Sequence, residues 1–191
     1  MHWSLEPSSI PAIAFALLGG IALASACGLR AFLPLFALSV ATRVGLAHLA
    51  PGAAWIGSTT AMWTLAVATV LELVADKVPI VDHALDAVST FVRPAAAAVA
   101  GWATFGAVDP SLSWIAAVVL GAGALGVHAL KAKTRLGSTA LTLGHANPIL
   151  SVGEDVTAAV LSAAAFLAPL LAAILVVGAL IWLVARRRRA S

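Results

Sequence analysis

The sequence has little charge for its length. Only 10% of its 191 residues are Asp, Glu, Lys or Arg, whereas 62% are hydrophobic. A soluble domain carries about 25% charged residues and about 45–50% apolar ones. Too few charged residues remain to cover a surface that faces water, so the composition excludes a soluble globular domain. Lipid is therefore the expected partner of most of the chain.

Several chemical signatures are also missing. Cys27 is the only cysteine, which excludes a disulfide framework and a cysteine metal cluster. There is no phosphate-binding loop, and no spacing brings Ser, His and Asp together as a catalytic triad. No Lys or Arg precedes the first apolar run, whereas a secretory signal begins with a basic region. We therefore expect no cleaved signal, no catalytic residues of these classes and no cofactor.

Long apolar runs are abundant. Runs of about 20 residues recur, which is the length a helix needs to cross a hydrocarbon core about 30 Å thick. The runs are continuous in Ala, Leu, Val and Ile, whereas a membrane barrel needs alternating segments of about ten residues. The pattern predicts an all-α, polytopic membrane bundle of about six membrane helices, in one integral membrane domain over residues 1–191. The expected apolar segments are 9–28, 31–49, 57–75, 94–108, 110–129 and 156–185.

Two regions predict broken or re-entrant segments. In residues 29–50, Arg30 stands between the helix interrupters Gly28 and Pro34. In residues 136–170, a turn-rich linker to residue 153 contains a break at Gly144–Pro148, and Pro169 interrupts the apolar run that follows. Ser151 with Glu154 matches a capping box, and Asp109-Pro110 matches a helix start.

Residues 79–93 predict an amphipathic helix. On a helical wheel one face is polar and the opposite face is apolar, so we expect this helix at the membrane interface or lining a polar cavity. The polar face carries Asp82, Asp86, Ser89, Thr90 and Arg93, and the apolar face carries Ile80, Ala84, Val88 and Phe91.

The basic C-terminal tail, residues 186–191, predicts the orientation. Its four arginines, Arg186–Arg189, indicate a cytoplasmic C-terminus by the positive-inside tendency, and they fit acidic lipid headgroups better than nucleic acid. One conflict follows. If residues 156–185 cross once, then Lys131, Lys133 and Arg135 face outward. Either residues 136–150 dip into the membrane or the last segment does not cross simply.

Three strings together carry a family resemblance: SACGLRAFLPLF, ELVADKVPIVDHALDAVSTFVRP and HALKAKTR…NPILSVGEDV. They resemble a family of bacterial integral membrane proteins known as domain of unknown function four-one-two-six, over about residues 10–167. The resemblance implies a multi-helix inner-membrane protein and supplies no reaction. The residues that fall in the family's motifs are Arg30, Asp76, Asp82, Asp86, Arg93, Glu154 and Asp155.

Arg30 is the sharpest clue to a site. A charge near the bilayer interior costs from about 2.5 to more than 10 kcal/mol, so it is normally paired or lines a wet cavity. A broken helix beside a guanidinium would make an anion site. Arg30 and Lys131 are therefore candidate substrate-binding residues. The alternative is an arginine that snorkels from a helix end.

The carboxylates are candidates for proton or ion coupling. Glu72 and Asp76 are four residues apart at the end of an apolar helix, where two nearby carboxylates suit a proton or cation site. They could instead form ion pairs with Arg30 or Lys131 that hold helices together. The candidate coupling residues are Glu72, Asp76, Asp82, Asp86, Glu154 and Asp155, and the candidate structural polar residues are Thr90, Arg93 and His128.

A metal site is the alternative use of the same region. Asp82, His83 and Asp86, joined by His128 or Glu72, could hold a divalent metal. The spacing is far less specific than an HExxH motif, and which metal it would bind is undetermined.

The expected function is a small inner-membrane transporter or permease for an anionic or lipid-like solute, coupled to protons or cations. A basic residue followed by an acidic pair in each half suggests an inverted repeat, and the short chain favours a homodimer. The alternatives are a metal-dependent membrane enzyme acting on a lipid or isoprenoid headgroup, and a non-catalytic scaffold subunit. The residues favour a role other than catalysis.

Overall fold

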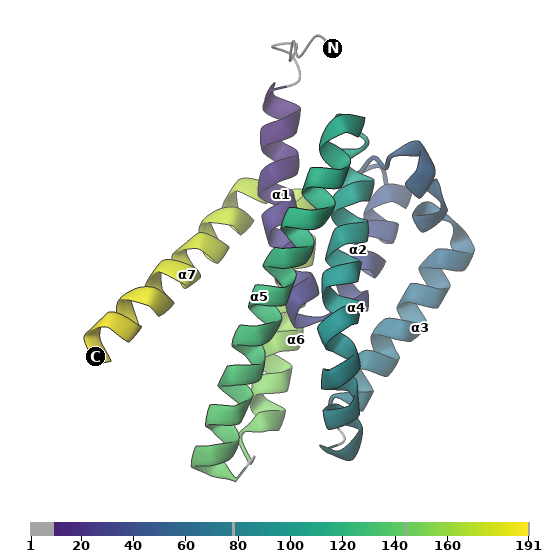
Figure 1. Cartoon of the computed structure of the whole chain (residues 1–191). Coiled ribbons are helices and arrows are strands. Elements are labelled where there is room, and N and C mark those ends of the chain that lie inside the picture. The colour runs from purple at the N-terminus through teal and green to yellow at the C-terminus, as the bar shows by residue number, and fades with distance from the viewer. Residues whose placement is uncertain (1–9, 78, 144, 191) are drawn as a thin grey trace.

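The fold consists of helices in the part of the chain that the structure, a computed structural model, describes. That part is residues 10–77, 79–143 and 145–190, without the side chains of 10, 79–87, 183, 184 and 187–190. The predicted all-α membrane bundle is confirmed. The elements, coloured along the chain in Figure 1, are α1 (Ile10–Leu29), α2 (Phe32–Arg43), the 3-10 helix η2 (Pro51–Gly57), α3 (Thr59–Ala75), α4 (Pro79–Phe105), α5 (Pro110–Thr142), α6 (Asn147–Leu167) and α7 (Pro169–Ala190).

Three described helices, α1, α5 and α6, are long and apolar enough to cross a membrane. The pair η2 and α3 meets at a bend of 62° and makes a fourth if the two form one broken span. Helix α2 has 12 residues and rises about 18 Å, which is too short for a hydrocarbon core of about 30 Å. By length and composition the described chain therefore offers three or four spans, where the sequence suggested about six.

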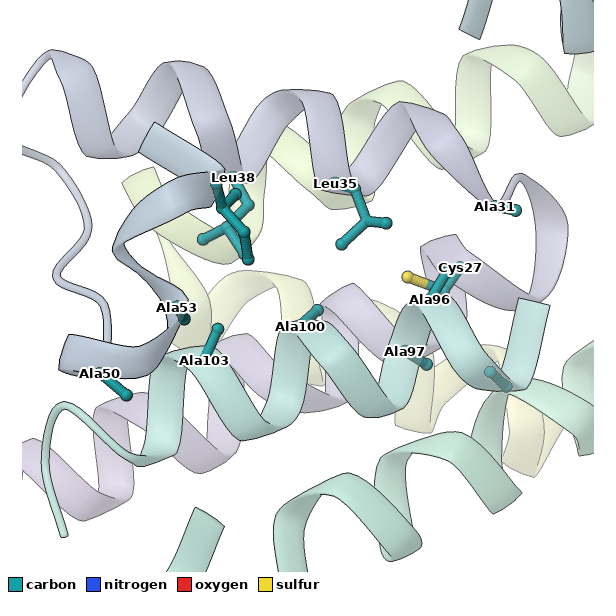
Figure 2. Close-up of a cluster of buried hydrophobic side chains, with 12 residues drawn as sticks. Cys27, Ala31, Leu35, Leu38, Ala50, Ala53, Ala96, Ala97, Ala100 and Ala103 are labelled. Atoms are coloured by element: carbon teal, nitrogen blue, oxygen red, sulfur yellow. The ribbon is translucent and has the colours of Figure 1, made fainter. Parts of the chain in front are cut away.

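Helices α1 and α2 form a helical hairpin whose turn contains Arg30. Leu38 of α2 packs near Ala50 and Ala103, far from the start of α2 at Ala31, which lies beside Cys27 (Figure 2). Helix α2 therefore runs back along α4 toward the end at which α1 begins. The interruption predicted around Arg30 is a tight turn between two helices, and it leaves Arg30 at the tip of the hairpin.

The last apolar run is two helices. Helix α6 ends at Leu167, and α7 begins at Pro169, the proline at which the sequence predicted a break. Figure 1 shows α7 turning back there and running toward the end of the molecule that carries the α5–α6 turn. The basic C-terminal end of α7 and Lys131, Lys133 and Arg135 of α5 therefore point to the same end. The apolar run 156–185 is therefore broken and folds back, which agrees with the second alternative drawn from the sequence, a last segment that does not cross simply.

The bundle packs through small residues. The largest core cluster contains Ala96, Ala97, Ala100 and Ala103 of α4 below Leu35 and Leu38 of α2 (Figure 2). Lipid gives little hydrophobic driving force between membrane helices, so close backbone approach and van der Waals packing hold them together. Small side chains permit that approach.

Glycines mark the closest helix crossings. A Cβ atom placed on Gly28 of α1 would lie 2.6 Å from the carbonyl oxygen of Ala124 in α5, and one on Gly19 would lie 2.8 Å from that of Ala165 in α6. No side chain fits at these distances. Helix α1 is therefore pressed directly against the backbones of α5 and α6.

The amphipathic segment 79–93 is the first half of a longer helix. It continues through Pro94 to Phe105 in α4, so the separate apolar segment predicted to begin at Pro94 is wrong. In the described side chains, Val88 and Phe91 are exposed whereas Ser89 and Arg93 are buried. Among these described residues the apolar face therefore points outward, whereas the polar face is divided, because Thr90 is also exposed.

The α5–α6 region corrects two further predictions. Residues 136–142, predicted as linker, continue α5, and α6 begins at Asn147. Ser151 and Glu154 therefore lie inside a helix, and the predicted capping box is wrong. Helix α6 starts one turn earlier, with Ala146 as its N-cap and Pro148 in its first turn. The break predicted between residues 144 and 148 is confirmed by the end of α5 at Thr142.

The helix start predicted at Asp109 is confirmed. Its carboxylate accepts hydrogen bonds from the Ser111 N–H at 2.8 Å and the Ser111 hydroxyl at 2.7 Å. Pro110 occupies the first turn of α5, where its missing N–H costs nothing. The Ser111 hydroxyl and N–H together hold the pKa of Asp109 below its ordinary value.

Candidate functional site

Glu72 caps the α1–α2 turn. Its two carboxylate oxygens accept hydrogen bonds from the backbone N–H groups of Ala31, at 2.8 Å, and Phe32, at 3.1 Å. These are the free N–H groups at the start of α2, which no residue of α2 itself satisfies. Glu72 also places a negative charge at the positive end of the α2 dipole. The residue predicted as a coupling carboxylate is thus bound to backbone donors.

Replacing Glu72 with glutamine is expected to lower the free energy of unfolding by about 1–2 kcal/mol. The amide keeps one acceptor oxygen and loses both the second acceptor and the charge. Thermal unfolding in detergent measures the loss. The matched control is Asp109→Asn, where asparagine caps α5 as well as aspartate does, so its effect should be within about 0.5 kcal/mol of zero. Equal midpoints for the two variants would contradict the capping role.

Arg30 is the centre of a buried polar cluster. Its side chain has no exposed surface, and its Nη2 atom lies 2.5 Å from Asp76 Oδ2. The same nitrogen donates to the Ser151 hydroxyl at 3.1 Å and forms an ion pair with Asp155. Asp76 lies at the end of α3, and Asp155 lies within α6. The prediction that Arg30 meets acidic residues is therefore supported by the geometry, and the snorkelling alternative is not.

Asp76 connects three cations. It pairs with Arg30, with Arg135 Nη2 at 2.8 Å and with Lys131 Nζ at 3.7 Å. It also accepts a hydrogen bond of 2.5 Å from the Ser151 hydroxyl. Its side chain is only 3% exposed. A carboxylate so buried needs this many donors, because each charge removed from water costs several kcal/mol unless it is compensated.

Glu154 extends the cluster toward α5. It lies 3.0 Å from Lys131 Nζ and 2.9 Å from Arg135 Nη2, and it accepts a second bond of 3.3 Å from Arg135 Nε. Lys131 and Arg135 are one helical turn apart on α5, so one face of that helix presents both cations to Glu154. The fork of Arg135 holds the carboxylate in a bidentate pair.

Asp155 forms the outer edge of the cluster. One of its oxygens pairs with Arg30, and the other lies 2.8 Å from Lys77 Nζ. The side chains become steadily more exposed along this line, from 0% for Arg30 through 18% for Asp155 to 42% for Lys77. Asp155 is therefore the connection between the buried guanidinium and the surroundings.

A second polar unit lies on α4 and α5. Arg93 Nη1 donates to His128 Nδ1, and His128 Nε2 lies 3.2 Å from the Thr90 hydroxyl. An arginine only donates, so Nδ1 of His128 accepts and its other ring nitrogen carries the proton in the neutral form. The three residues predicted as structural polar residues do meet one another.

The structure brings together most of the predicted site residues. Arg30, Asp76, Lys131, Glu154 and Asp155 converge in one cluster, with Glu72 at its edge. Asp82 and Asp86 are on the α4 backbone, but their side chains are outside the described residues. The members that sequence reasoning missed are Lys77, Arg135 and Ser151. Only Arg135 had a signal, its spacing of four residues from Lys131.

The described residues offer no support for the predicted metal site. None of them forms a group of three or more His, Cys, Asp or Glu side chains that could hold a metal ion. In the cluster, Asp76, Glu154 and Asp155 face Lys and Arg side chains, which neutralise them in the way a metal otherwise would. The predicted ligands Asp82, His83 and Asp86 are outside this comparison.

No curated protein and no solved structure matches the chain. Residues 17–189 match a protein family described as Domain of unknown function (DUF4126). The match covers far more than half of the chain and includes every member of the polar cluster. The resemblance inferred from the three sequence strings is therefore confirmed. This helical membrane protein, with its buried ion cluster at the tip of the α1–α2 hairpin, belongs to the DUF4126 family.

Proposed function

We propose that this protein is a small membrane permease that accepts an anionic solute at Arg30. One observation carries the proposal. Arg30 is completely buried at the tip of the α1–α2 hairpin, and the carboxylate of Asp155 links it to the partly exposed Lys77. Asp155 thus occupies Arg30 in the way that the carboxylate or other anionic group of a solute would.

The unused donors of Arg30 support an anion site. Its Nε and Nη1 atoms are buried and have no hydrogen-bond partner among the described residues, while four oxygen-bearing residues crowd Nη2: Asp76, Ser151, Glu154 and Asp155. A buried donor without a partner costs about 1–3 kcal/mol. A bound anion beside Arg30 would accept from Nη2 and from one of these two donors, and Lys131 would add a second positive charge nearby.

The remaining carboxylates suit the coupling role in different degrees. Asp76 and Glu154 hold two or more cations each, so a change in the protonation of either would rearrange contacts among α1, α3, α5 and α6. Glu72 suits coupling less well, because it is engaged by backbone N–H groups. An inverted repeat and a homodimer stay predictions. In support of the repeat, Arg30 and Lys131 are the basic residues that correspond in the two halves, and both lie close to Asp76 and Glu154.

A non-catalytic scaffold is the second candidate. It is favoured by Asp76, which ties three helices together through its three cations. In a scaffold the cluster would only lock the helices, and exchange of its carboxylates for a solute would have no role. The two candidates differ in whether Arg30 is needed for anything except stability.

The conservative variant Arg30→Lys separates permease from scaffold. Lysine keeps the charge and loses the planar fork that binds carboxylates in two places, so we expect uptake of a probe anion to fall at least tenfold. Uptake of radiolabelled chloride, nitrate and gluconate into proteoliposomes measures the effect, with protein-free liposomes as the baseline. The matched control is Arg43→Lys, at an exposed arginine, and it should transport like the wild type. Absence of uptake by the wild type for all three anions would contradict the permease and leave the scaffold.

We further propose that the protein lies in a bacterial inner membrane with its basic end in the cytoplasm. Single cysteines introduced by Lys133→Cys and Ala185→Cys, in a Cys27→Ala background, should react with an impermeant maleimide from the cytoplasmic side. Ala107→Cys, in the exposed α4–α5 turn, should react from the opposite side. Labelling of right-side-out and lysed vesicles makes the comparison. Reaction of positions 107 and 133 from the same side would contradict the orientation.

A further inference from the structure

An apolar cavity, which we call the α2–α6 groove, lies between α2 and α6, with Thr69 of α3 in its wall. Its volume is about 460 Å³, within the range of about 300–1,000 Å³ that is usual for pockets that bury a small ligand. None of the described residues that line it is charged. The hydroxyl groups of Thr69 and Ser162 donate to carbonyl oxygens of their own helices, at 2.7 Å each. The groove therefore offers its occupant an apolar surface.

On α2 the groove follows one face of the helix. Its lining positions recur at intervals of three and four residues, so they lie along one side of α2. They are Leu33, Phe36, Ala37, Val40, Ala41 and Val44. Since a helix rises about 1.5 Å per residue, this face extends about 16 Å. It begins three residues after Arg30, at the end of the molecule where the polar cluster lies, and runs toward the far end of α2.

On α6 the groove follows the face that carries Asp155. The α6 residues that line it include Ala159, Ser162, Ala163 and Phe166. At about 100° per residue, these positions share one side of the helix with Asp155. Asp155 pairs with both Arg30 and Lys77, so two cations stand at one end of the groove. An anion that took the place of Asp155 would have the apolar groove directly beside it.

The groove opens toward lipid. Its lining residues Val44, Ala159, Ala163 and Leu167 are exposed, and lipid tails are as apolar as these side chains. A molecule dissolved in one leaflet can therefore enter the groove sideways, without first passing through water.

We propose that the solute of this permease is a single-chain amphipathic anion, whose charged group binds Arg30 and whose apolar chain lies in the α2–α6 groove. This inference rests on the proposed permease function and names the class of its solute. The cations at one end of the groove and the uncharged lining along it match the two parts of such a molecule. Small anions such as chloride fill only the Arg30 end, so they bind more weakly than an anion with a chain.

Inhibition of uptake by alkyl sulfonates of increasing length tests the groove. Unlabelled methanesulfonate, butanesulfonate and octanesulfonate compete with whichever of radiolabelled chloride, nitrate and gluconate the wild type carries into proteoliposomes. Sulfonates stay charged near neutral pH, so they do not cross the bilayer as neutral acids. Octanesulfonate should inhibit at a concentration at least about sixtyfold below that of methanesulfonate, which is the effect of burying three of its seven additional CH₂ groups.

Filling the groove should remove this dependence on chain length. Ala163→Phe places a large side chain at an exposed position that lines the groove, and with the chain no longer buried the two inhibitory concentrations should agree to within about threefold. The matched control is Ala122→Phe, at an exposed alanine of α5 outside the groove, and it should keep the wild-type dependence. 1-Octanol has the chain without the charge and should not inhibit at the concentration at which octanesulfonate does.

Three results would overturn the chain site and leave the permease intact. They are equal inhibition of the wild type by all three sulfonates, an unchanged dependence on chain length in Ala163→Phe, and inhibition by 1-octanol as strong as that by octanesulfonate. If Ala163→Phe fails to fold, the wild-type series and 1-octanol decide the question without it. Absence of wild-type uptake for all three radiolabelled anions would overturn the solute class and the permease together.

Discussion

Replacing Asp76 with asparagine is expected to lower the free energy of unfolding by about 3–5 kcal/mol. The substitution keeps the shape of the side chain and removes the charge that compensates Arg30, Lys131 and Arg135. All three cations are nearly buried, so water cannot replace the lost carboxylate. The midpoint of thermal or denaturant unfolding in detergent measures the loss.

Two comparisons sharpen this prediction. Asp109→Asn makes the same change at a partly exposed carboxylate outside the cluster, where asparagine caps α5 equally well, so it should alter stability by less than about 0.5 kcal/mol. The double variant Asp76→Asn with Lys131→Met removes one of the uncompensated cations, so it should be more stable than the sum of the two single effects. Equal stability of Asp76→Asn and Asp109→Asn would show that Asp76 does not hold the cluster together.

Replacing Gly28 with alanine is expected to cost about 1–3 kcal/mol. The new Cβ atom would lie 2.6 Å from the Ala124 carbonyl oxygen, and a backbone atom of α5 cannot move away as a flexible side chain would. Helices α1 and α5 must separate, which also pulls the hairpin tip with Arg30 away from Lys131. Thermal unfolding reports the stability, and loss of the close α1–α5 contact should also weaken anion uptake.

The control for this prediction is Gly126→Ala on α5. A Cβ atom there meets nothing within 4 Å, and alanine is the better helix former by up to about 1 kcal/mol. The same substitution is thus expected to destabilise the protein at Gly28 and to stabilise it slightly at Gly126. Similar effects at both positions would show that helix propensity, and not the α1–α5 approach, determines the outcome at Gly28.

Local signals in the sequence predicted the helices and several of their ends. The start of α5 at Asp109-Pro110 and the break at Pro169 were both readable, because a cap or a proline acts on residues within one turn of it. The same reasoning failed at Ser151 and Glu154, which match a capping box but lie inside α6. A four-residue motif such as a capping box also occurs by chance inside helices. Here the helix begins at Asn147-Pro148, so Ser151 is already within it.

Local sequence signals could not predict which residues the charged side chains pair with. Arg30 and Asp76 are 46 residues apart, and Arg30 and Ser151 are 121 apart. No periodicity links positions so distant, and the composition only requires that a buried charge be compensated somewhere. Arg135 was detectable by its spacing from Lys131, whereas Ser151 and Lys77 gave no signal before the helices were assembled.

By itself the sequence determined the solvent of this protein and its helical class, since both follow from composition, whereas it left open whether Arg30 pairs with carboxylates or snorkels from a helix end. Only the tertiary structure decided which carboxylates these are, that Glu72 binds backbone N–H groups, and that α7 turns back to bring both basic segments to one end. Those outcomes depend on how α1, α3, α5 and α6 pack, and packing is set by contacts between residues far apart in the chain.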